Sequence, residues 1–335
     1  MGEHFLRAVE IEVGGTKFTY DGTIPDNLAD GRGDGPGLRI SFDTHQRDSS
    51  TPNYANIRIF NVSEKAAASA LVRGAEVKIS AGYAGQVAEI FKGQVIQART
   101  NVRDRPDDPN TALVILATDS GIARNFAVAN KTLSAGHTHA DRVMACIDAM
   151  KAQGVGLGYI ASAALSKTKF PRGIALFGMA KDILRATCAA TNTSFSIQRG
   201  KAQILENGKG LPGGVIPLRA DTGLLGLPVQ TIQGVEARIQ LNGNIVVGSM
   251  VSIDSKIIQQ SSFSPAYGSA NENYYLDSAR LATDGIYKVY VVEHVGDTRG
   301  GVFETAIVCI RKGALANPAL ASRMVPLPDS SPTGN

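Results

Sequence analysis

Carboxylate side chains in the second half of the chain could support the most demanding chemistry that this sequence allows. Glycoside hydrolysis needs two carboxyl groups, one of which must act as an acid with a raised pKa. The candidate carboxylates are Glu236, Glu272, Glu293 and Glu304. Nothing in their sequence context marks one of them as such an acid, and most alternate outward on predicted strands. The sequence therefore favours a non-enzymatic role.

Several other side chains are of types that bind metal ions. His137 and His139 have no cysteine nearby and no histidine four residues on, so a zinc site is not expected. Three aspartates lie in a loop that lacks the glycine and closing glutamate of a calcium-binding helix-loop-helix: Asp104, Asp107 and Asp108. The three cysteines lie in apolar contexts and are expected to be buried free thiols: Cys146, Cys188 and Cys309. No metal or cofactor is predicted.

Three short motifs invite a functional interpretation, yet each is better explained by a turn. His294 and Asp297 lie close together, but strand-like sequences flank them, so we predict a hairpin with unusual backbone angles at Gly296 and Gly300. In that hairpin Asp297 or Thr298 bonds to the turn. The tripeptide Arg32-Gly33-Asp34 lies among glycines that predict a tight loop. The glycine-rich segment 154–158 follows a predicted helix, whereas a dinucleotide-binding loop follows a strand.

The composition fits a turn-rich β protein of more than one domain. A chain of 335 residues is usually too long for one compact core, so two or three domains are expected. Charged residues make up 19% of it, below the roughly 25% of an average globular protein, and it has 36 glycines and no tryptophan. The net charge is only +4 and the basic residues look scattered, which argues against a dedicated nucleic-acid binder. Since neither a signal peptide nor a membrane-spanning stretch is found, we expect folding in the cytosol.

The elements that must position these residues show two different repeats of apolar side chains, one typical of strands and one typical of helices. Residues 1–120 read as short strands, in which Ile40 and Phe42 alternate with polar neighbours and Ser63 can cap one inserted helix. Residues 121–208 change to a helical period, with a helix from Thr138 and a hairpin across Arg199-Gly200. Alternation resumes over residues 209–312, and residues 313–335 have the composition of a flexible extension. The sequence thus predicts two β domains that flank a small α+β insert.

The turn residues of the second β domain recur in an order that resembles a known family. They are Thr222, Gly223, Leu224, Gly226, Pro228, Gly234, Val235, Gly248, His294, Gly296, Asp297 and Thr298. In order and spacing they resemble the baseplate hub, or tail-tip hub, proteins of tailed bacteriophages. The segment 56–83 is similar to the strand, helix, strand passage of that family's tube-like barrel.

The resemblance implies a structural assembly protein rather than an enzyme. Hub proteins of this family are homotrimers, and each subunit contributes two tube-like β-barrels to a pseudo-sixfold ring. Such a ring would join the tail tube protein to a trimeric spike protein, contact other baseplate proteins and leave a lumen for DNA. The implied location is the tail baseplate of a virion assembled in the host cytoplasm, without a cofactor or a membrane anchor.

Other interpretations remain open at this point. A tail-associated cell-wall hydrolase would depend on carboxylates such as Glu236 or Glu293. A module that binds surface glycans is a further alternative. Closely related hubs also occur in contractile bacteriocins, which the sequence does not distinguish from virions.

Overall fold

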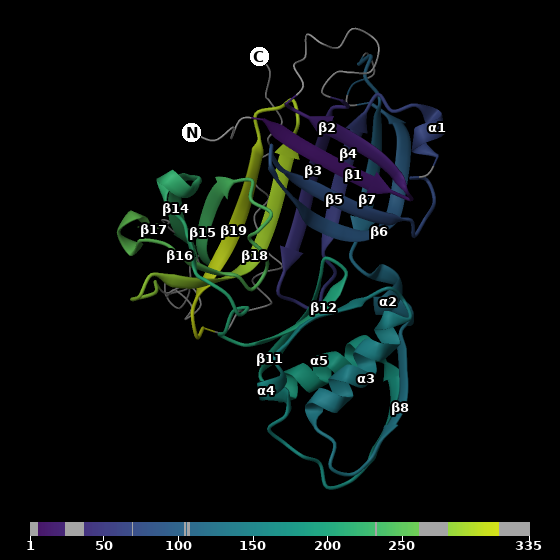
Figure 1. The fold of residues 1–335 in the computed structure, drawn as a ribbon, viewed down its shortest axis with the longest axis vertical. Coiled ribbons are helices and arrows are strands. Elements are labelled where there is room, and N and C mark those ends of the chain that lie inside the picture. The colour runs from purple at the N-terminus through teal and green to yellow at the C-terminus, as the bar shows by residue number, and fades with distance from the viewer. Residues whose placement is uncertain are drawn as a thin grey trace, which may run out of the picture.

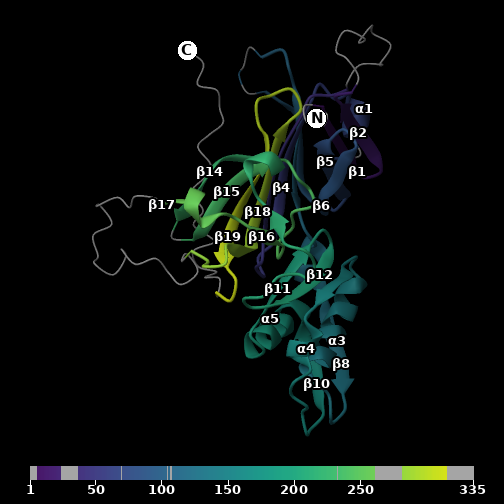
Figure 2. The same ribbon diagram turned by 60° about the vertical axis from the view of Figure 1, so that its left-hand side comes forward.

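The computed structural model describes residues 6–23, 37–260 and 281–314, apart from residues 69, 104, 106, 107 and 232. A large sheet contains strands from both ends of this sequence, and residues 121–208 extend away from it as a separate α+β unit (Figure 1, Figure 2). We call this unit the insert. The Arg32-Gly33-Asp34 motif, two of the three loop aspartates and Glu272 lie outside the described residues.

Seven antiparallel strands before residue 119 form the first β half. They are β1 (Arg7–Val13), β2 (Thr16–Asp21), β3 (Ile40–Arg47), β4 (Tyr54–Phe60), β5 (Glu76–Tyr83), β6 (Gln86–Val102) and β7 (Ala112–Thr118). Their spatial order is β3-β4-β7-β6-β5-β1-β2. The long strand β6 has 17 residues, and the sheet folds over so that β1 and β5 lie across β3, β4 and β7 (Figure 1).

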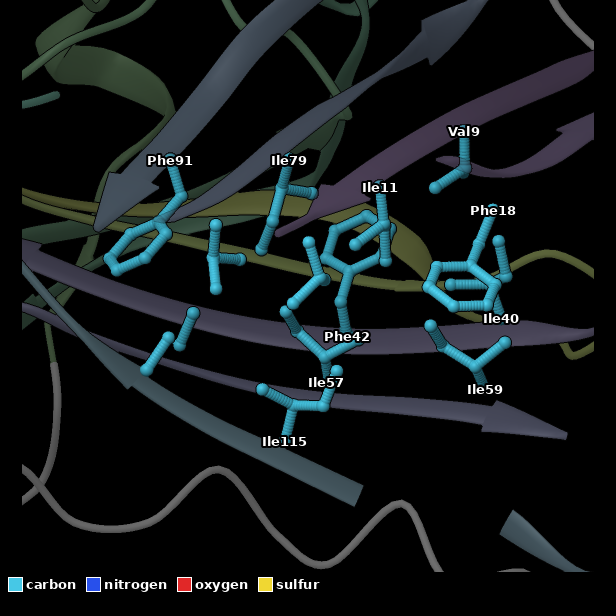
Figure 3. Packing of buried hydrophobic residues seen from close by; sticks show 14 of the residues in the cluster. Val9, Ile11, Phe18, Ile40, Phe42, Ile57, Ile59, Ile79, Phe91 and Ile115 are labelled. Carbon is cyan, nitrogen blue, oxygen red and sulfur yellow. The ribbon is translucent and has the colours of Figure 1, made fainter. Parts of the chain in front are cut away.

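The core of the first β half lies between these two layers. Figure 3 shows Ile11 and Ile79 from one layer facing Phe42 and Ile57 from the other. All four side chains are at most 3% exposed, and burying one such side chain contributes about 1.5–3 kcal/mol. The inward alternation predicted for Ile40 and Phe42 is confirmed.

The inserted helix of this half is shorter than predicted. The sequence predicts a helix that Ser63 begins and Gly74 closes. Helix α1 (Glu64–Ala67) begins as predicted, because the Ser63 hydroxyl accepts a hydrogen bond from the Ala66 amide at 3.3 Å. Beyond Ala67 the chain continues in tighter turns, because the amides of Ala70 and Leu71 donate to carbonyls three residues back. The amide of Gly74 then donates to the Val95 carbonyl of β6 at 2.9 Å, next to the start of β5.

The second β half contains the remaining strands of the sheet. They are β13 (Ile216–Pro217), β14 (Leu224–Thr231), β15 (Gly234–Gln240), β16 (Met250–Ser252), β17 (Gln259–Gln260), β18 (Ile286–Asp297) and β19 (Phe303–Arg311). The order β17-β14-β15-β19-β18 leads to the middle of the sheet. A bulge at Tyr290 separates Val289, in the main core of this half, from Val291, in a smaller cluster. The sequence predicts that Val289 and Val291 alternate with Lys288 and Tyr290 and so share one face of the strand, and the bulge shows that this prediction is wrong.

Strand β18 pairs antiparallel with β3, so the two β halves form one continuous sheet of 14 strands. An isolated bridge between Tyr20 and Gly37 is the described link from β2 toward the start of β3. The mainly β fold is confirmed, but the described strands do not close into a barrel.

The insert packs two small sheets against helices. Its elements are α2 (Gly121–Phe126), β8 (Val128–Leu133), α3 (His139–Lys151), β9 (Gly156–Ile160), α4 (Ser162–Leu165), β10 (Ile174–Met179), α5 (Ala180–Ala190), β11 (Thr193–Gln198) and β12 (Lys201–Glu206). The predicted capping box of Thr138 and Asp141 and the hairpin across Arg199 are confirmed.

All three cysteines of the chain are buried and free, as predicted. None of the helices in the described ranges has the length and apolar character needed to cross a bilayer.

Candidate functional site

The segment from His294 to Gly300 lies where the two β halves meet. Its first residues continue β18, and residues 298–302 turn the chain into β19, so the predicted hairpin is confirmed. On the other side of β18, His294 lies opposite Thr44 and Gly296 lies opposite Phe42 of β3. The segment is therefore a joint between two strands from distant parts of the chain.

Thr298 extends the pairing of β18 and β3 by one further step. Its amide donates to the Ile40 carbonyl at 2.9 Å, and the Ile40 amide donates to the Thr298 hydroxyl at 3.0 Å. Thr298 is 4% exposed, so these polar groups would lack partners without each other. The prediction that this side chain bonds to its own turn is thus replaced by a bond across the joint.

Asp297 organises the turn itself, as predicted. Its carboxylate accepts hydrogen bonds from the amides of Arg299 at 2.9 Å and Gly300 at 3.0 Å. The Arg39 guanidinium donates to the same carboxylate at 2.7 Å. Partial burial disfavours the charged form, but these donors outweigh it and hold the pKa of Asp297 below its ordinary value.

Arg7 fastens this turn to the start of β1. Its guanidinium donates to the Asp297 carbonyl at 2.5 Å and also to the Gly300 carbonyl, and it lies 5.1 Å from the centre of the Phe303 ring. Sequence reasoning missed this residue, because no local signal connects Arg7 with a turn 290 residues away. The joint therefore includes the first described strand as well as β3.

The glycines of the hairpin are needed for space rather than for unusual backbone angles. Neither Gly296 nor Gly300 has a positive φ, so that prediction is wrong. A Cβ at Gly296 would lie 2.5 Å from Cζ of Phe42, and one at Gly300 would lie 2.8 Å from Cγ of Asp297. Both glycines keep room for side chains that hold the joint together.

His294 is a structural residue of the core. It is completely buried, its Nδ1 lies 2.9 Å from the Thr305 hydroxyl, and its amide donates to Thr44 at 3.3 Å. Burial, with a smaller contribution from Arg199, lowers the pKa of His294 to about 3. The imidazole is therefore neutral, and the odd spacing to Asp297 places the two side chains on opposite faces of β18. They cannot act as an acid and base pair.

Three of the carboxylates considered for hydrolysis, Glu236, Glu293 and Glu304, lie on the outer face of the second β half. Glu293 bonds to Nδ1 of His45, and Glu304 lies 3.7 Å from Arg238. No sequence signal marks Glu236 as an acid with a raised pKa, yet desolvation of its carboxyl group and then Glu293 raise its pKa. Because much of the Glu236 side chain is nevertheless exposed, water limits that effect.

A pocket found elsewhere does not offer a better catalytic site. It lies beside α1 and contains one titratable side chain, Glu64, among apolar and amide groups. Hydrolysis by two carboxyl groups needs a second acid at short distance. This pocket therefore lacks the pair of carboxyl groups that such hydrolysis requires.

The histidines near α3 bind to neighbouring protein groups. His137 Nδ1 lies 2.8 Å from the Ser134 carbonyl, and its Nε2 accepts hydrogen bonds from Arg142 at 3.0 and 3.1 Å. His139 lies edge-on to Phe170, and burial lowers its pKa. Across the described ranges, no group of three potential ligands is placed to hold a metal ion.

The remaining family-motif residues occupy the outer part of the second β half. The Thr222 hydroxyl donates to the Pro217 carbonyl at 2.8 Å. Leu224 begins β14, Pro228 lies within it, and Val235 is 1% exposed in β15. Four of the motif glycines have a positive φ: Gly223, Gly226, Gly234 and Gly248. A Cβ at Gly234 would lie 2.2 Å from the Cys309 carbonyl oxygen. The structure thus brings together only the late motif residues, at the joint, and leaves the others at the turns around β14, β15 and β16.

A second joint connects the insert to the sheet. Asn53 donates to the Ile197 carbonyl at 2.8 Å and accepts from the Arg47 amide at 3.0 Å. Beside it, Arg124 of α2 lies 3.6 Å from Asp119, and burial raises the pKa of Asp119 to about 7. Sequence reasoning missed these residues, because each lies in a segment whose local pattern suggests only a loop or a helix.

Comparison with known proteins identifies the fold. No protein-family model and no curated protein sequence matches this chain. Among solved structures, the 43 kDa tail protein of prophage MuSo2 from Shewanella oneidensis matches with a TM-score of 0.53 and 9% identity, over 91% of this chain and 98% of that one. A tail protein from Neisseria meningitidis MC58 also matches with a TM-score of 0.53 and 9% identity, over 92% of this chain and 97% of that one. The chain therefore shares the fold of these two tail proteins.

Proposed function

We propose that this chain is the central hub of a phage-like tail, a homotrimer that joins the tail tube to a trimeric spike. The observation that carries the proposal is the fold shared with two tail proteins over nearly the whole length of all three chains. The hub assignment goes further, and it rests on the order of turn residues from Thr222 to Thr298.

The arrangement of the sheet suits such an adaptor. Each β half has its own buried cluster, and β3 and β18 join the halves edge to edge. Three chains would then present six β halves in a ring, which matches a sixfold tube on one side and a threefold spike on the other. Pairing between subunits would complete the tube-like barrels and surround a lumen for DNA.

The same proposal assigns a role to each part of the chain. Residues 1–120 and 209–312 form the two tube-like units, residues 121–208 form the insert, and residues 313–335 form an extension. The protein works in the tail baseplate of a virion, after assembly in the host cytoplasm, beside other baseplate proteins. We infer that its role is structural rather than enzymatic, since Glu293 and Glu304 are engaged by basic neighbours.

The mass of the purified full chain in solution tests the proposal. A trimer has a mass of about 106 kDa, three times the 35.2 kDa of one chain, and particle images are expected to show a ring with a central hole. A chain that stays monomeric, both alone and when co-produced with the spike and tube proteins of its particle, would contradict the hub assignment.

Two alternatives are separated by further measurements. If the chain were a cell-wall hydrolase, it would release soluble peptidoglycan fragments, and Glu236→Gln, at the carboxylate with the raised pKa, would abolish that activity. A hub from a contractile bacteriocin would have the same mass and ring. It would be distinguished by purified particles that contain no DNA.

A further inference from the structure

The positive charge of this protein is concentrated in the insert. Residues 121–208 contain 11 lysines and arginines against 4 aspartates and glutamates, which gives a net charge of +7. The other residues contain 23 against 26, a net charge of −3, and the two values add to the +4 of the whole chain. The basic residues are therefore less scattered than the sequence first suggested.

One face of the insert is apolar and uncharged. Strands β8 and β10 form a two-stranded ribbon in which Val128 lies opposite Met179 and Asn130 lies opposite Phe177. The alternate residues, such as Leu176, are buried against the core of the insert, so these four point outward. Phe177 is 79% exposed, Val128 is 48% exposed, and Phe126, just before β8, is 69% exposed. Such large exposed side chains side by side are typical of interaction sites.

The ribbon leads into a cationic tip. The loop after β8 and the loop before β10 are hydrogen-bonded to each other. The Gly136 amide donates to the Phe170 carbonyl at 2.7 Å, and the Phe170 amide donates to the His137 carbonyl at 2.9 Å. In the same tip Lys169 and Arg172 are exposed, and neither forms an ion pair with a described residue. The tip therefore presents positive charge beside the apolar face, on loops fixed by backbone bonds.

The charge of the insert indicates the chemistry of the occupant of this surface. A net charge of +7 over residues 121–208, with Lys169 and Arg172 exposed at the tip, is complemented by acidic side chains. A different protein with an acidic rim around an apolar patch is the complementary partner.

Symmetry indicates which partner this is, on the basis of the proposed function. Each chain has two β halves but a single insert, so a trimer has three inserts, which is the symmetry of the spike rather than that of the tube. The insert also extends away from the sheet in both views (Figure 1, Figure 2). We infer that the outer face of the β8–β10 ribbon, with the tip at Lys169 and Arg172, is the docking surface for an acidic spike-side protein.

The experiment measures binding of the full chain to the spike protein of the same particle. Two variants change the surface, Phe177→Ser and the double variant K169E/R172E. Two controls change exposed side chains of the first β half, Val72→Ser and Lys65→Glu, and Val72 is 60% exposed. All these positions are on the surface, so folding should be preserved, and circular dichroism and solution mass check that.

The inference predicts that both surface variants weaken spike binding about tenfold or more, whereas both controls stay within about twofold of the wild type. Binding by the wild type should also weaken with added salt, and less so for K169E/R172E. Equal binding by all variants would overturn the docking surface and leave the proposed hub intact. A wild type that binds no spike would overturn the hub assignment and this inference together. If the surface variants instead lost binding to duplex DNA and kept the spike, the surface would belong to nucleic acid.

Discussion

Single residues decide how closely β18 can approach β3, and Gly296 is the clearest case. In Gly296→Ala the new methyl group would lie 2.5 Å from Cζ of Phe42 and 2.9 Å from Cδ2 of Phe303. Both distances are too short, so both rings must shift. We expect a loss of about 1–3 kcal/mol in the free energy of unfolding, measured by urea denaturation. Gly301→Ala is the matched control, because no atom lies within 4 Å of its Cβ position. A loss of equal size in both variants would contradict the steric explanation.

His294 makes the stability of the same joint depend on pH. Its pKa is lowered from 6.5 to about 3 in the folded protein, so the unfolded chain binds a proton that the folded chain does not. This contribution to stability is complete above pH 6.5 and is lost as the pH falls toward 3. The expected slope is up to about 1.4 kcal/mol per pH unit. Asp119, whose pKa is raised, acts in the opposite direction, so the effect of His294 must be isolated by a variant.

The variant His294→Gln isolates this effect. It has no group that titrates in this range, so the difference in unfolding free energy between it and the wild type should shrink steadily as the pH is lowered. Urea denaturation at several pH values between about 7 and 4 measures that difference. A difference that does not change with pH would show that His294 takes up its proton equally in the folded and unfolded states, which would contradict the lowered pKa.

At the scale of elements, several hydrogen bonds connect the insert to the sheet, and Asn53 takes part in more than one. Its side chain donates to the Ile197 carbonyl of β11 and accepts from the Arg47 amide. In Asn53→Ala these buried groups lose their partners, at a cost of about 1–3 kcal/mol each.

Hydrogen exchange locates the effect of this change. In Asn53→Ala we expect faster exchange for amides of β11 and β12, and little change for amides of β5, on the far side of the first β half. The control Asn244→Ala removes an exposed side chain near the same joint and should leave both sets unchanged. Uniformly faster exchange across the whole chain would instead indicate global destabilisation.

Local sequence signals predicted the elements better than their connections. The capping box at Thr138 and the alternation of Ile40 with Phe42 were correct because each depends on residues a few positions apart. The bulge at Tyr290 was missed. Strand β18 pairs with both β19 and β3, and the spacing of apolar residues within β18 carries no information about either partner. The space required at Gly296 depends on Phe42, which is equally invisible to local reasoning.

At the scale of the whole molecule, distant segments meet repeatedly in the middle of the sheet. Besides the pairing of β3 with β18, Lys288 forms a buried ion pair with Asp48 at 2.8 Å, 240 residues away in sequence. Removing one partner of such a pair leaves an uncompensated buried charge, which is strongly destabilising. The sequence alone predicted the mainly β class and two β regions but not their fusion into one sheet, because strand pairing across such distances leaves no periodic trace.

The same connection has a consequence for synthesis on the ribosome. Strand β3 is complete at Arg47, but its partner β18 begins only at Ile286, 239 residues later. At about 5–20 residues per second, the edge of β3 waits on the order of ten to fifty seconds without its neighbour. During that interval the nascent first half offers an open strand edge to other chains. The yield of native protein should therefore depend on translation speed and on chaperones that cover this edge.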